Sequence, residues 1–254
     1  MVFNEEMAHF NERWLNTPQG YYLESREKGL ILNLTTPQWG ETVLEVGCGT
    51  GEHLLFFQKQ GCYVSGLEPS PALLEVARKK LGDRAELRLG RAADLPFPDN
   101  EFDIVSLILS ETFTEDWEIA IGEAIRVCRG RVFIGVLNIL SLAALQLKWR
   151  GLFKPSLSET GRFSRIGELK GMVRRLLPGV RIQWGSVIFL PAGWYGFAIG
   201  LEEAIPTRHN PFGAFLGLSF PVHFNLRTVQ DIIGDPFQIK QEEGQPAQGI
   251  VTVR

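Results

Sequence analysis

Short apolar runs alternate with longer segments of helical periodicity between Glu41 and Leu137, and this alternation limits the possible folds more than any other feature of the chain. The apolar runs predict strands at Thr42–Val46, Tyr63–Leu67, Ala85–Leu89, Phe102–Leu109 and Arg131–Leu137. The segments between them predict helices at Glu52–Gln60, Pro71–Leu81 and Trp117–Val127. Strands that alternate with helices form βαβ units, in which helices cover both faces of a parallel sheet. The chain is therefore predicted to have an α/β fold.

The pattern changes after Leu137. Residues 138–149 and 165–176 have helical periodicity, and residues 180–190 and 213–220 have the character of strands. From about Asp231 to the end, the periodicity is weak. The longest apolar stretch, from Val132 to Leu145, is shorter than the roughly 20 residues that a membrane-spanning helix needs, so we expect a buried strand followed by a helix.

Composition and charge narrow the function classes. The three cysteines are too few for a disulfide framework and favour the cytoplasm, and the acidic N-terminus lacks the apolar segment of a secretory signal. A net charge of −3 disfavours nucleic acid as a partner. Residues 148–181 nevertheless hold nine Lys and Arg against two Glu. This stretch is either a solvated helix face or a surface for an anionic substrate or an acidic membrane.

A glycine-rich turn follows the first predicted strand. The segment Val43–His53 has the sequence VLEVGCGTGEH, in which Gly47, Gly49 and Gly51 stand at alternate positions just before a predicted helix. Glycine lets the backbone turn tightly and approach a ligand closely, and the N–H groups at a helix start point toward such a ligand. In open α/β sheets, ligands bind at the carboxyl ends of the strands. We therefore expect a nucleotide-type ligand at this turn.

The spacing of the glycines indicates which ligand. A dinucleotide-binding turn has the pattern GxGxxG, but Glu52 stands where its third glycine would be, and a carboxylate there would repel a pyrophosphate. There is also no lysine of the kind found in phosphate-binding P-loops. Glu45 instead suits a ligand that carries positive charge. S-adenosylmethionine, which has an ammonium and a sulfonium group and no phosphate, fits this pattern; a nicotinamide-dependent oxidoreductase remains an alternative.

Three segments in order resemble the class I S-adenosylmethionine-dependent methyltransferases of the "type 11" subgroup. They are the turn at Val43–Gly51, the segment from Gly66 (GLEPSPALL) and the segment from Gly90 (GRAADLPFPDNEFDIV). The resemblance extends more weakly from about Phe10 to Phe220. It implies a Rossmann-like, doubly wound sheet of seven mainly parallel strands, with the last strand antiparallel. It also implies methyl transfer to a small molecule, with S-adenosylhomocysteine as the product.

The resemblance assigns cofactor-binding roles residue by residue. Glu68, 23 residues after Glu45, stands where the family binds both ribose hydroxyls. The acidic residue that helps to hold adenine in the family is Arg91 here, so adenine would depend on the backbone of Ala92 and Ala93, on apolar contacts, or on Asp94. The full set of expected cofactor-binding residues is Glu45, Gly47, Cys48, Gly49, Gly51, His53, Glu68, Pro69, Ala92, Ala93, Ile108, Leu109, Trp14 and Tyr21. No metal site is expected.

The acceptor and the catalytic base are less constrained by the sequence. Candidate bases are Glu111 and His209, with Asp116 and His223 as further options. The segment after Leu109 lacks the [DN]PP[YF] pattern of enzymes that methylate exocyclic amines of bases or glutamine. Aromatic residues between 113 and 197, beside the basic stretch, favour an apolar or anionic small molecule. A protein that binds S-adenosylmethionine without catalysis is the main alternative.

These inferences give a domain plan. Residues 1–225 are expected to form the methyltransferase domain, with a helical cover at 1–40 and an insertion or lid on the acceptor side at 138–212. Residues 226–254 are expected to be a C-terminal extension. No integral membrane segment is expected, although peripheral membrane contact through 148–181 is compatible with the charge.

Overall fold

A computed structural model of the chain describes residues 17–109, 116–138, 141, 166–191, 194–195 and 198–222. These residues belong to one compact unit that ends at residue 223. The domain boundaries expected from the sequence stay a prediction.

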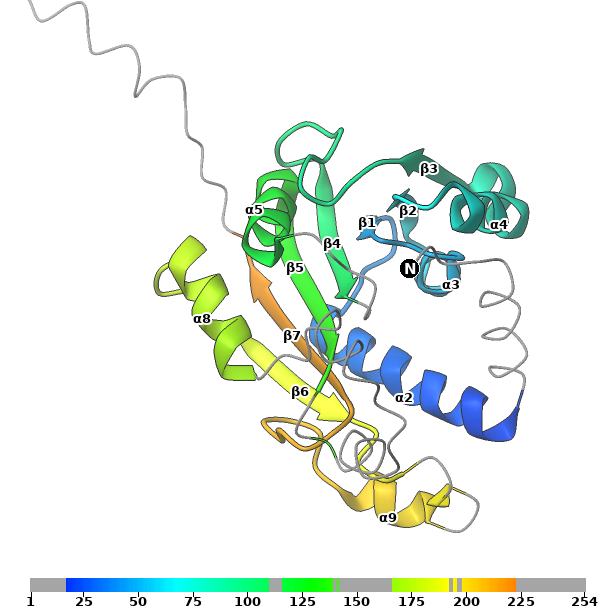
Figure 1. Cartoon of the computed structure of the whole chain (residues 1–254), viewed down its shortest axis with the longest axis vertical. Helices are drawn as coiled ribbons and strands as arrows, with labels where there is room; N and C mark the ends of the chain where they lie inside the picture. The colour runs from blue at the N-terminus through cyan, green and yellow to red at the C-terminus, as the bar shows by residue number, and fades with distance from the viewer. Residues whose placement is uncertain are drawn as a thin grey trace, which may run out of the picture. The chain divides into compact units, whose positions relative to one another are not determined.

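Seven strands form one sheet with the order β3-β2-β1-β4-β5-β7-β6 (Figure 1). The strands are β1 (Thr42–Val46), β2 (Tyr63–Glu68), β3 (Ala85–Leu89), β4 (Phe102–Leu109), β5 (Cys128–Leu137), β6 (Gln183–Val187) and β7 (Phe215–Pro221). The first five strands pair in parallel, whereas β7 lies between β5 and β6 and is antiparallel to both. The predicted fold class, including the antiparallel last strand, is confirmed.

Helices cover the two faces of the sheet. They are α2 (Pro18–Thr35), α3 (Glu52–Lys59), α4 (Pro71–Leu81), α5 (Trp117–Val127), α8 (Ile166–Leu176) and α9 (Ile199–Ala204), with a 3-10 turn at Gly82–Arg84. One buried apolar cluster joins α2 and α3 to the sheet, and a second joins α5 and α8 to it. Both faces are therefore buried, as a parallel sheet requires.

Local sequence signals explain where the helices begin. Thr17 and Ser70 each precede a proline, and their side chains accept hydrogen bonds from the backbone N–H groups of Gly20 and Leu73. This pairing of an N-cap with proline in the first turn is a strong start signal for a helix. It fixes the direction in which α2 and α4 leave the preceding loops.

The end of β6 differs from its prediction. Residues 180–190 were expected to be one strand, but the strand ends at Val187 because Ile188 has a φ of 69°. This left-handed conformation is strained for a β-branched residue. It directs the N–H groups of Ile188, Phe189 and Leu190 to the buried carboxylate of Glu202 in α9, at 2.9–3.1 Å. The hydrogen bonds offset the backbone strain.

The other boundaries agree with the sequence within a few residues. β2 continues to Glu68, β5 begins at Cys128, and β7 begins at Phe215. The helix predicted at 138–149 lies outside the described residues except at Asn138 and Ser141. The predicted insertion at 138–212 contributes α8 and β6 to the helical cover and the sheet; its role as a lid stays a prediction.

Asp103 links the starts of β1, β4 and β5. Its carboxylate accepts hydrogen bonds from the backbone N–H and the hydroxyl of Thr42, at 2.9 and 3.0 Å, and from two nitrogens of Arg129, at 2.7 and 2.8 Å. The hydrogen bonds from Arg129 are the main reason why the pKa of Asp103 lies well below its usual range. Asp103 is therefore a structural residue at the edge of the sheet opposite the glycine turn.

We expect Asp103→Asn to lower the free energy of unfolding at neutral pH by about 1–3 kcal/mol, because an amide cannot accept all four of these bonds. Urea unfolding measures the change. Asp83→Asn, which replaces an exposed carboxylate of the 3-10 turn, is the control and should leave stability within about 0.5 kcal/mol. Equal losses in the two variants would contradict the assignment.

Candidate functional site

The glycine turn after β1 has the conformation that its sequence predicts. Gly47, Gly49 and Gly51 all have positive φ, at 77°, 53° and 81°. A Cβ at Gly47 or Gly49 would meet no atom within 4 Å, whereas one at Gly51 would lie 2.8 Å from Leu81 of α4. Gly51 is therefore required for packing, while Gly47 and Gly49 face open space at the carboxyl edge of the sheet.

Glu68 stands at the tip of β2, next to this turn. One carboxylate oxygen accepts the backbone N–H of Gly49 at 2.9 Å, and the other accepts the N–H of Ser70 at 2.9 Å. The side chain is buried, and burial raises the pKa of Glu68 despite these two hydrogen bonds. Each oxygen retains lone pairs for a further donor. The turn and the carboxylate thus form one connected unit.

Glu45 and His53 lie on the other side of the glycine turn. Oε1 of Glu45 is 3.0 Å from Nδ1 of His53, which is in the first turn of α3, and Oε2 of Glu45 is buried without a hydrogen-bond partner. Burial lowers the pKa of His53, but the adjacent Glu45 carboxylate outweighs this effect and leaves the pKa raised. A buried carboxylate oxygen without a donor indicates a place for a ligand that carries N–H groups.

Glu27 of α2 completes this cluster and was missed by the sequence reasoning. It occupies the stripe of α2 that carries the buried Leu23, Leu30 and Leu34. Burial raises the pKa of Glu27 to about 7, with a smaller opposing effect from His53. A carboxyl group within the apolar stripe of an amphipathic helix was the sequence signal that could have found it. Glu27 and Glu45 both favour the charged form of His53.

The loop after β3 places its residues as follows. Ala92 is buried and Ala93 half-buried, so their backbone lies at the protein surface only in part. Arg91 and Asp94 are exposed and form an isolated β-bridge, with the Asp94 N–H bonded to the Arg91 carbonyl at 3.2 Å. Asp94 therefore does not turn into the protein. Leu67 and Leu95 are fully buried in the core.

The remaining predicted cofactor-binding residues of the strand ends differ in how far they are buried. Cys48 is buried within the glycine turn, Pro69 is exposed beyond Glu68, and Ile108 is half-buried at the end of β4. Leu109 ends β4, and its side chain lies outside the described residues. All of these residues lie at the carboxyl ends of neighbouring strands, so the structure brings them to one edge of the sheet.

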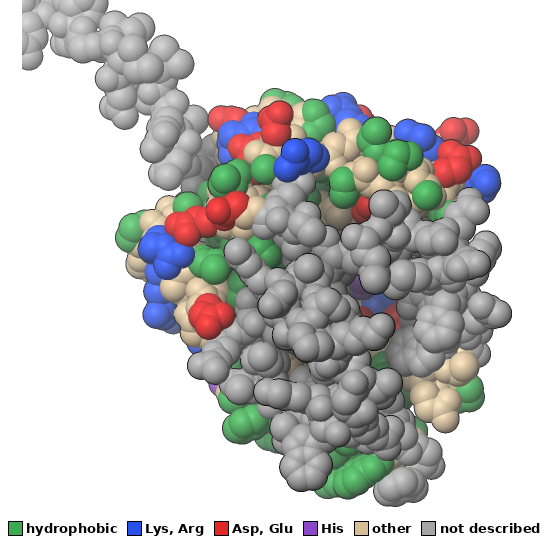
Figure 2. All heavy atoms as spheres, viewed as in Figure 1, with side chains coloured by type: hydrophobic (Ala, Val, Ile, Leu, Met, Phe, Trp, Pro, Cys, Tyr) green, Lys and Arg blue, Asp and Glu red, His purple; other side chains and the backbone are tan. Residues whose placement is uncertain are grey.

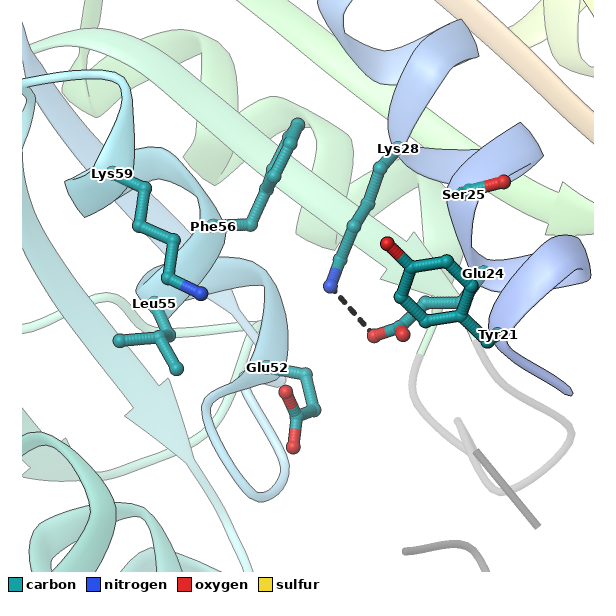
Figure 3. A pocket seen from close by; sticks show the side chains of 8 residues that line it. All are labelled: Tyr21, Glu24, Ser25, Lys28, Glu52, Leu55, Phe56 and Lys59. Atoms are coloured by element: carbon teal, nitrogen blue, oxygen red, sulfur yellow. Dashed lines mark hydrogen bonds and ion pairs between the residues drawn. The ribbon is translucent and has the colours of Figure 1, made fainter. Parts of the chain in front are cut away.

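Tyr21 lies in a different place from the rest. It is 70% exposed and lines a pocket of about 240 Å³ between α2 and α3 (Figure 3). The other lining residues are Glu24, Ser25, Lys28, Glu52, Leu55, Phe56 and Lys59. Lys28 pairs with Glu24 at 2.6 Å in this pocket, while Glu52 pairs with Lys80 of α4. Trp14, the other predicted cover residue, lies outside the described residues.

The candidate bases are not brought to the glycine turn in the described part of the chain. His209 packs edge-on against Trp184, near the start of β6, with ring centroids 5.4 Å apart. Because β6 is parallel to β5, its start lies at the opposite edge of the sheet. Asp116 caps α5 by accepting the N–H of Glu118. Glu111 and His223 lie outside the described residues, which contain no group of three metal-ligating side chains.

Two of the four basic residues in the described part of the stretch 148–181 contact other side chains. Figure 2 shows Lys and Arg side chains over α8. Lys170 lies 4.1 Å from the centroid of the Trp184 ring, and Arg175 pairs with Glu118 of α5 at 2.7 Å, whereas Arg174 is exposed. Within the described ranges, no helix has the length and apolar character needed to cross a membrane. Peripheral membrane contact stays a prediction.

Comparison with known proteins agrees with this geometry. Residues 44–134 match a family model described as "Methyltransferase domain". The chain is 31% identical over 122 residues to malonyl-[acyl-carrier protein] O-methyltransferase from Serratia marcescens, an alignment that covers 47% of this chain and 48% of the relative. It is 41% identical over 76 residues to demethylmenaquinone methyltransferase from Symbiobacterium thermophilum, which covers 27% and 30% of the two chains. The chain thus spans about half the length, or less, of these curated relatives.

The fold is similar to solved structures over a longer range. A crystal structure from Thermotoga maritima, described as a SAM-dependent methyltransferase and possible histamine N-methyltransferase, matches with a TM-score of 0.62 and 20% identity. The match covers 85% of this chain and 96% of that chain. At this identity, the likeness concerns the fold alone.

The Glu27–His53 cluster predicts how stability depends on pH. Glu27 binds its proton more tightly in the folded chain, so its contribution is complete below about pH 4.5 and is lost as pH rises toward about 7. Glu27→Gln, which mimics the protonated form, should therefore be more stable than the wild type at about pH 8 by roughly 1–3 kcal/mol and similar to it at about pH 4.

Urea unfolding at both pH values tests this expectation. Glu24→Gln, one turn earlier on α2, removes the pairing with Lys28 and should change stability by less than about 1 kcal/mol at either pH. Parallel pH profiles for Glu27→Gln and the wild type would show that Glu27 ionises normally.

Proposed function

We propose that this chain, which contains a class I S-adenosylmethionine-dependent methyltransferase domain of the type 11 family, transfers a methyl group from S-adenosylmethionine to a small-molecule acceptor. S-adenosylmethionine is the cofactor of this family. The observation that carries the proposal is the carboxylate of Glu68, held by the N–H of Gly49 beside a glycine turn that opens to free space. This arrangement suits a ribose whose two hydroxyls donate to one carboxylate.

The residues present fit the cofactor at both of its ends. Oε2 of Glu45 is a buried acceptor without a donor, which suits the ammonium group of the methionine portion. His53 beside it, whose pKa Glu45 raises, suits the carboxylate of that portion when its imidazole is protonated. The open space at Gly47 and Gly49 lets the backbone approach the ligand closely. With Arg91 in place of an acidic residue, adenine would depend on the backbone of Ala92 and Ala93.

Methyl transfer mainly requires that the nucleophile of the acceptor and the methyl carbon of the cofactor be aligned. When bound, S-adenosylmethionine would supply an electrophilic methyl group on a sulfonium; the acceptor's nucleophile would bond to that carbon as the carbon–sulfur bond breaks, leaving the electron pair on sulfur. The protein holds the two reacting atoms about 3–3.5 Å apart and in line, which alone can supply roughly 7–11 kcal/mol. A base is needed only where the acceptor must lose a proton. Glu111 remains the candidate from sequence, because His209 lies at the opposite edge of the sheet.

Two other functions are tested by two experiments, a binding titration and a screen for turnover. A binding protein without catalysis is favoured by Arg91, and it would bind S-adenosylhomocysteine but never turn over. A nicotinamide-dependent oxidoreductase is disfavoured by Glu52, whose carboxylate is at the start of α3 where a pyrophosphate would lie. Calorimetry with S-adenosylhomocysteine, NADH and NADPH distinguishes the last class, and a metabolite panel screened for production of S-adenosylhomocysteine distinguishes the first. Binding of a nicotinamide cofactor alone would overturn the proposal.

Glu68→Ala should weaken the binding of S-adenosylhomocysteine by about 1.5–3 kcal/mol, because two charge-assisted hydrogen bonds to the ribose are lost. Calorimetry measures the dissociation constant. Glu75→Ala removes an exposed carboxylate of α4 and is the matched control. An equal affinity in Glu68→Ala and Glu75→Ala would place the ribose elsewhere.

Gly49→Val should abolish the binding of S-adenosylhomocysteine. A branched side chain is strained at a φ of 53°, and it would fill the open space that faces the turn. Circular dichroism shows whether the variant folds, and calorimetry shows whether it binds. A folded variant with wild-type affinity would show that the ligand does not approach this turn.

A further inference from the structure

Three polar atoms of α2 are buried without a hydrogen-bond partner. They are Nε and Nη2 of Arg26 and the hydroxyl oxygen of Tyr22. Arg26 as a whole is half-buried, but these two nitrogens are shielded from solvent. Buried donors without an acceptor in a native structure call for an explanation. None of the chemistry described above uses these two residues. They therefore mark a second set of donors, separate from the glycine turn.

The free atoms of Arg26 have a recognisable geometry. Nε and Nη2 form one edge of the guanidinium plane, and their two N–H groups run parallel, which matches the two oxygens of a carboxylate. Tyr22 precedes Arg26 by four residues, so the two side chains lie on the same face of the helix. Burial is the main cause that raises the pKa of Tyr22, so its hydroxyl stays a donor at neutral pH. The pair offers three donors and one positive charge.

The buried carboxylate that acts on the hydroxyl of Tyr22 is already engaged. Glu202 accepts hydrogen bonds from three consecutive backbone N–H groups, those of residues 188–190, and from the hydroxyl of Tyr195 at 3.3 Å. These donors fill its acceptor capacity. The free edge of Arg26 is thus left for an anion that the described chain does not provide.

The position of the pair on α2 indicates what that anion belongs to. One face of α2, with Tyr21, Glu24 and Lys28, lines the pocket toward α3 (Figure 3). A second face packs on the sheet. Tyr22 and Arg26 lie on the third face, where the ring of Tyr22 meets that of Tyr195 at 5.3 Å. The pair therefore points toward the segment between β6 and α9.

The helix also places the pair at the correct edge of the sheet. α2 ends at Thr35, whose carbonyl accepts a hydrogen bond from Arg131 at the start of β5. The N-terminal half of α2 must then lie toward the carboxyl ends of the strands, where the glycine turn lies. Arg26 thus lies toward the same edge of the sheet as the glycine turn, on the face of α2 that is turned away from α3.

We propose that Arg26 and Tyr22 form the receptor for the carboxylate of the methyl acceptor, and that this acceptor is a small carboxylic acid with an apolar body. The carboxylate would accept from Nε and Nη2 of Arg26 and from the hydroxyl of Tyr22. The rings of Tyr22 and Tyr195 provide the apolar contact beside it. The proposal rests on the proposed methyl transfer, of which it specifies the acceptor class.

Benzoate is the test ligand and benzamide, which has the same shape without the charge, is its control. Calorimetry with the full chain, with and without saturating S-adenosylhomocysteine, should show benzoate binding at least about tenfold more tightly than benzamide. Arg26→Gln should weaken benzoate about tenfold or more, and Tyr22→Phe several-fold. Arg174→Gln removes an exposed arginine of α8 and should leave the affinity unchanged. Equal affinities for the two ligands, or for Arg26→Gln and the wild type, would overturn the receptor.

Two cofactor analogues test independently whether Arg26 holds the acceptor or the cofactor. Methylthioadenosine has the adenosyl part of S-adenosylhomocysteine without its carboxylate. We expect Arg26→Gln to leave the affinities for both unchanged. If the variant weakens S-adenosylhomocysteine but not methylthioadenosine, Arg26 holds the cofactor instead and the acceptor proposal fails. If the wild type does not bind S-adenosylhomocysteine, the proposed function is overturned instead. The benzoate titration without cofactor is independent of that outcome.

Thermal unfolding of the chain without ligand tests the claim that Arg26 has no internal anion. Arg26→Met should unfold at the same temperature as the wild type or higher, because it removes two buried nitrogens that have no hydrogen-bond partner. Arg131→Met, which removes a guanidinium paired with Glu41 at 2.6 Å, should unfold at a lower temperature. Equal losses in both variants would show that Arg26 has a partner within the protein and would overturn the proposal.

Discussion

The carboxylate of Glu68 depends on two backbone N–H groups, and the arrangement of the candidate site follows from them. Parallel pairing of β1 and β2 brings the glycine turn beside the tip of β2, where Gly49 and Ser70 fix the two carboxylate oxygens. A loop of ordinary residues could not adopt three positive φ angles within five positions. The site therefore depends jointly on the strand register, the glycines and the carboxylate, and a change in one of them displaces the others.

Negative charge accumulates at this edge of the sheet, and the fold balances it unevenly. Glu45, Glu68 and Glu27 are buried or half-buried near one another, and the carboxylates of Glu45 and Glu27 raise the pKa of His53, which lies among them. This environment favours a cationic ligand over a phosphate. On the third face of α2 the balance is reversed, since two guanidinium nitrogens of Arg26 are buried there without an acceptor. The two sites differ in charge although one helix borders both, which suits the proposed pairing of a positively charged donor with a negatively charged acceptor.

The sequence was sufficient to predict an element where a local signal agrees with the contacts that the element makes in the folded chain. The central strands β1, β4 and β5 are rich in buried apolar residues, the Thr17 and Ser70 caps precede prolines, and the glycines of the turn all have positive φ. Glu27 and Arg26 escaped prediction because a polar residue in a helix is normally a surface residue; only tertiary packing buries them. The end of β6 escaped for the same reason, because the strained Ile188 is stabilised by Glu202, a residue 14 positions away.

The position of β7 has a consequence for synthesis of the chain. β7 joins β5 to β6, so β6 cannot enter the sheet in register until the ribosome has released a segment that begins at Phe215. Until then the nascent chain exposes the bare edge of β5, a long apolar strand of the kind that invites aggregation. The part of the chain that carries the glycine turn is thus synthesised early, but its sheet is complete only after β7 has been synthesised. During that interval the open edge of β5 would benefit from a chaperone.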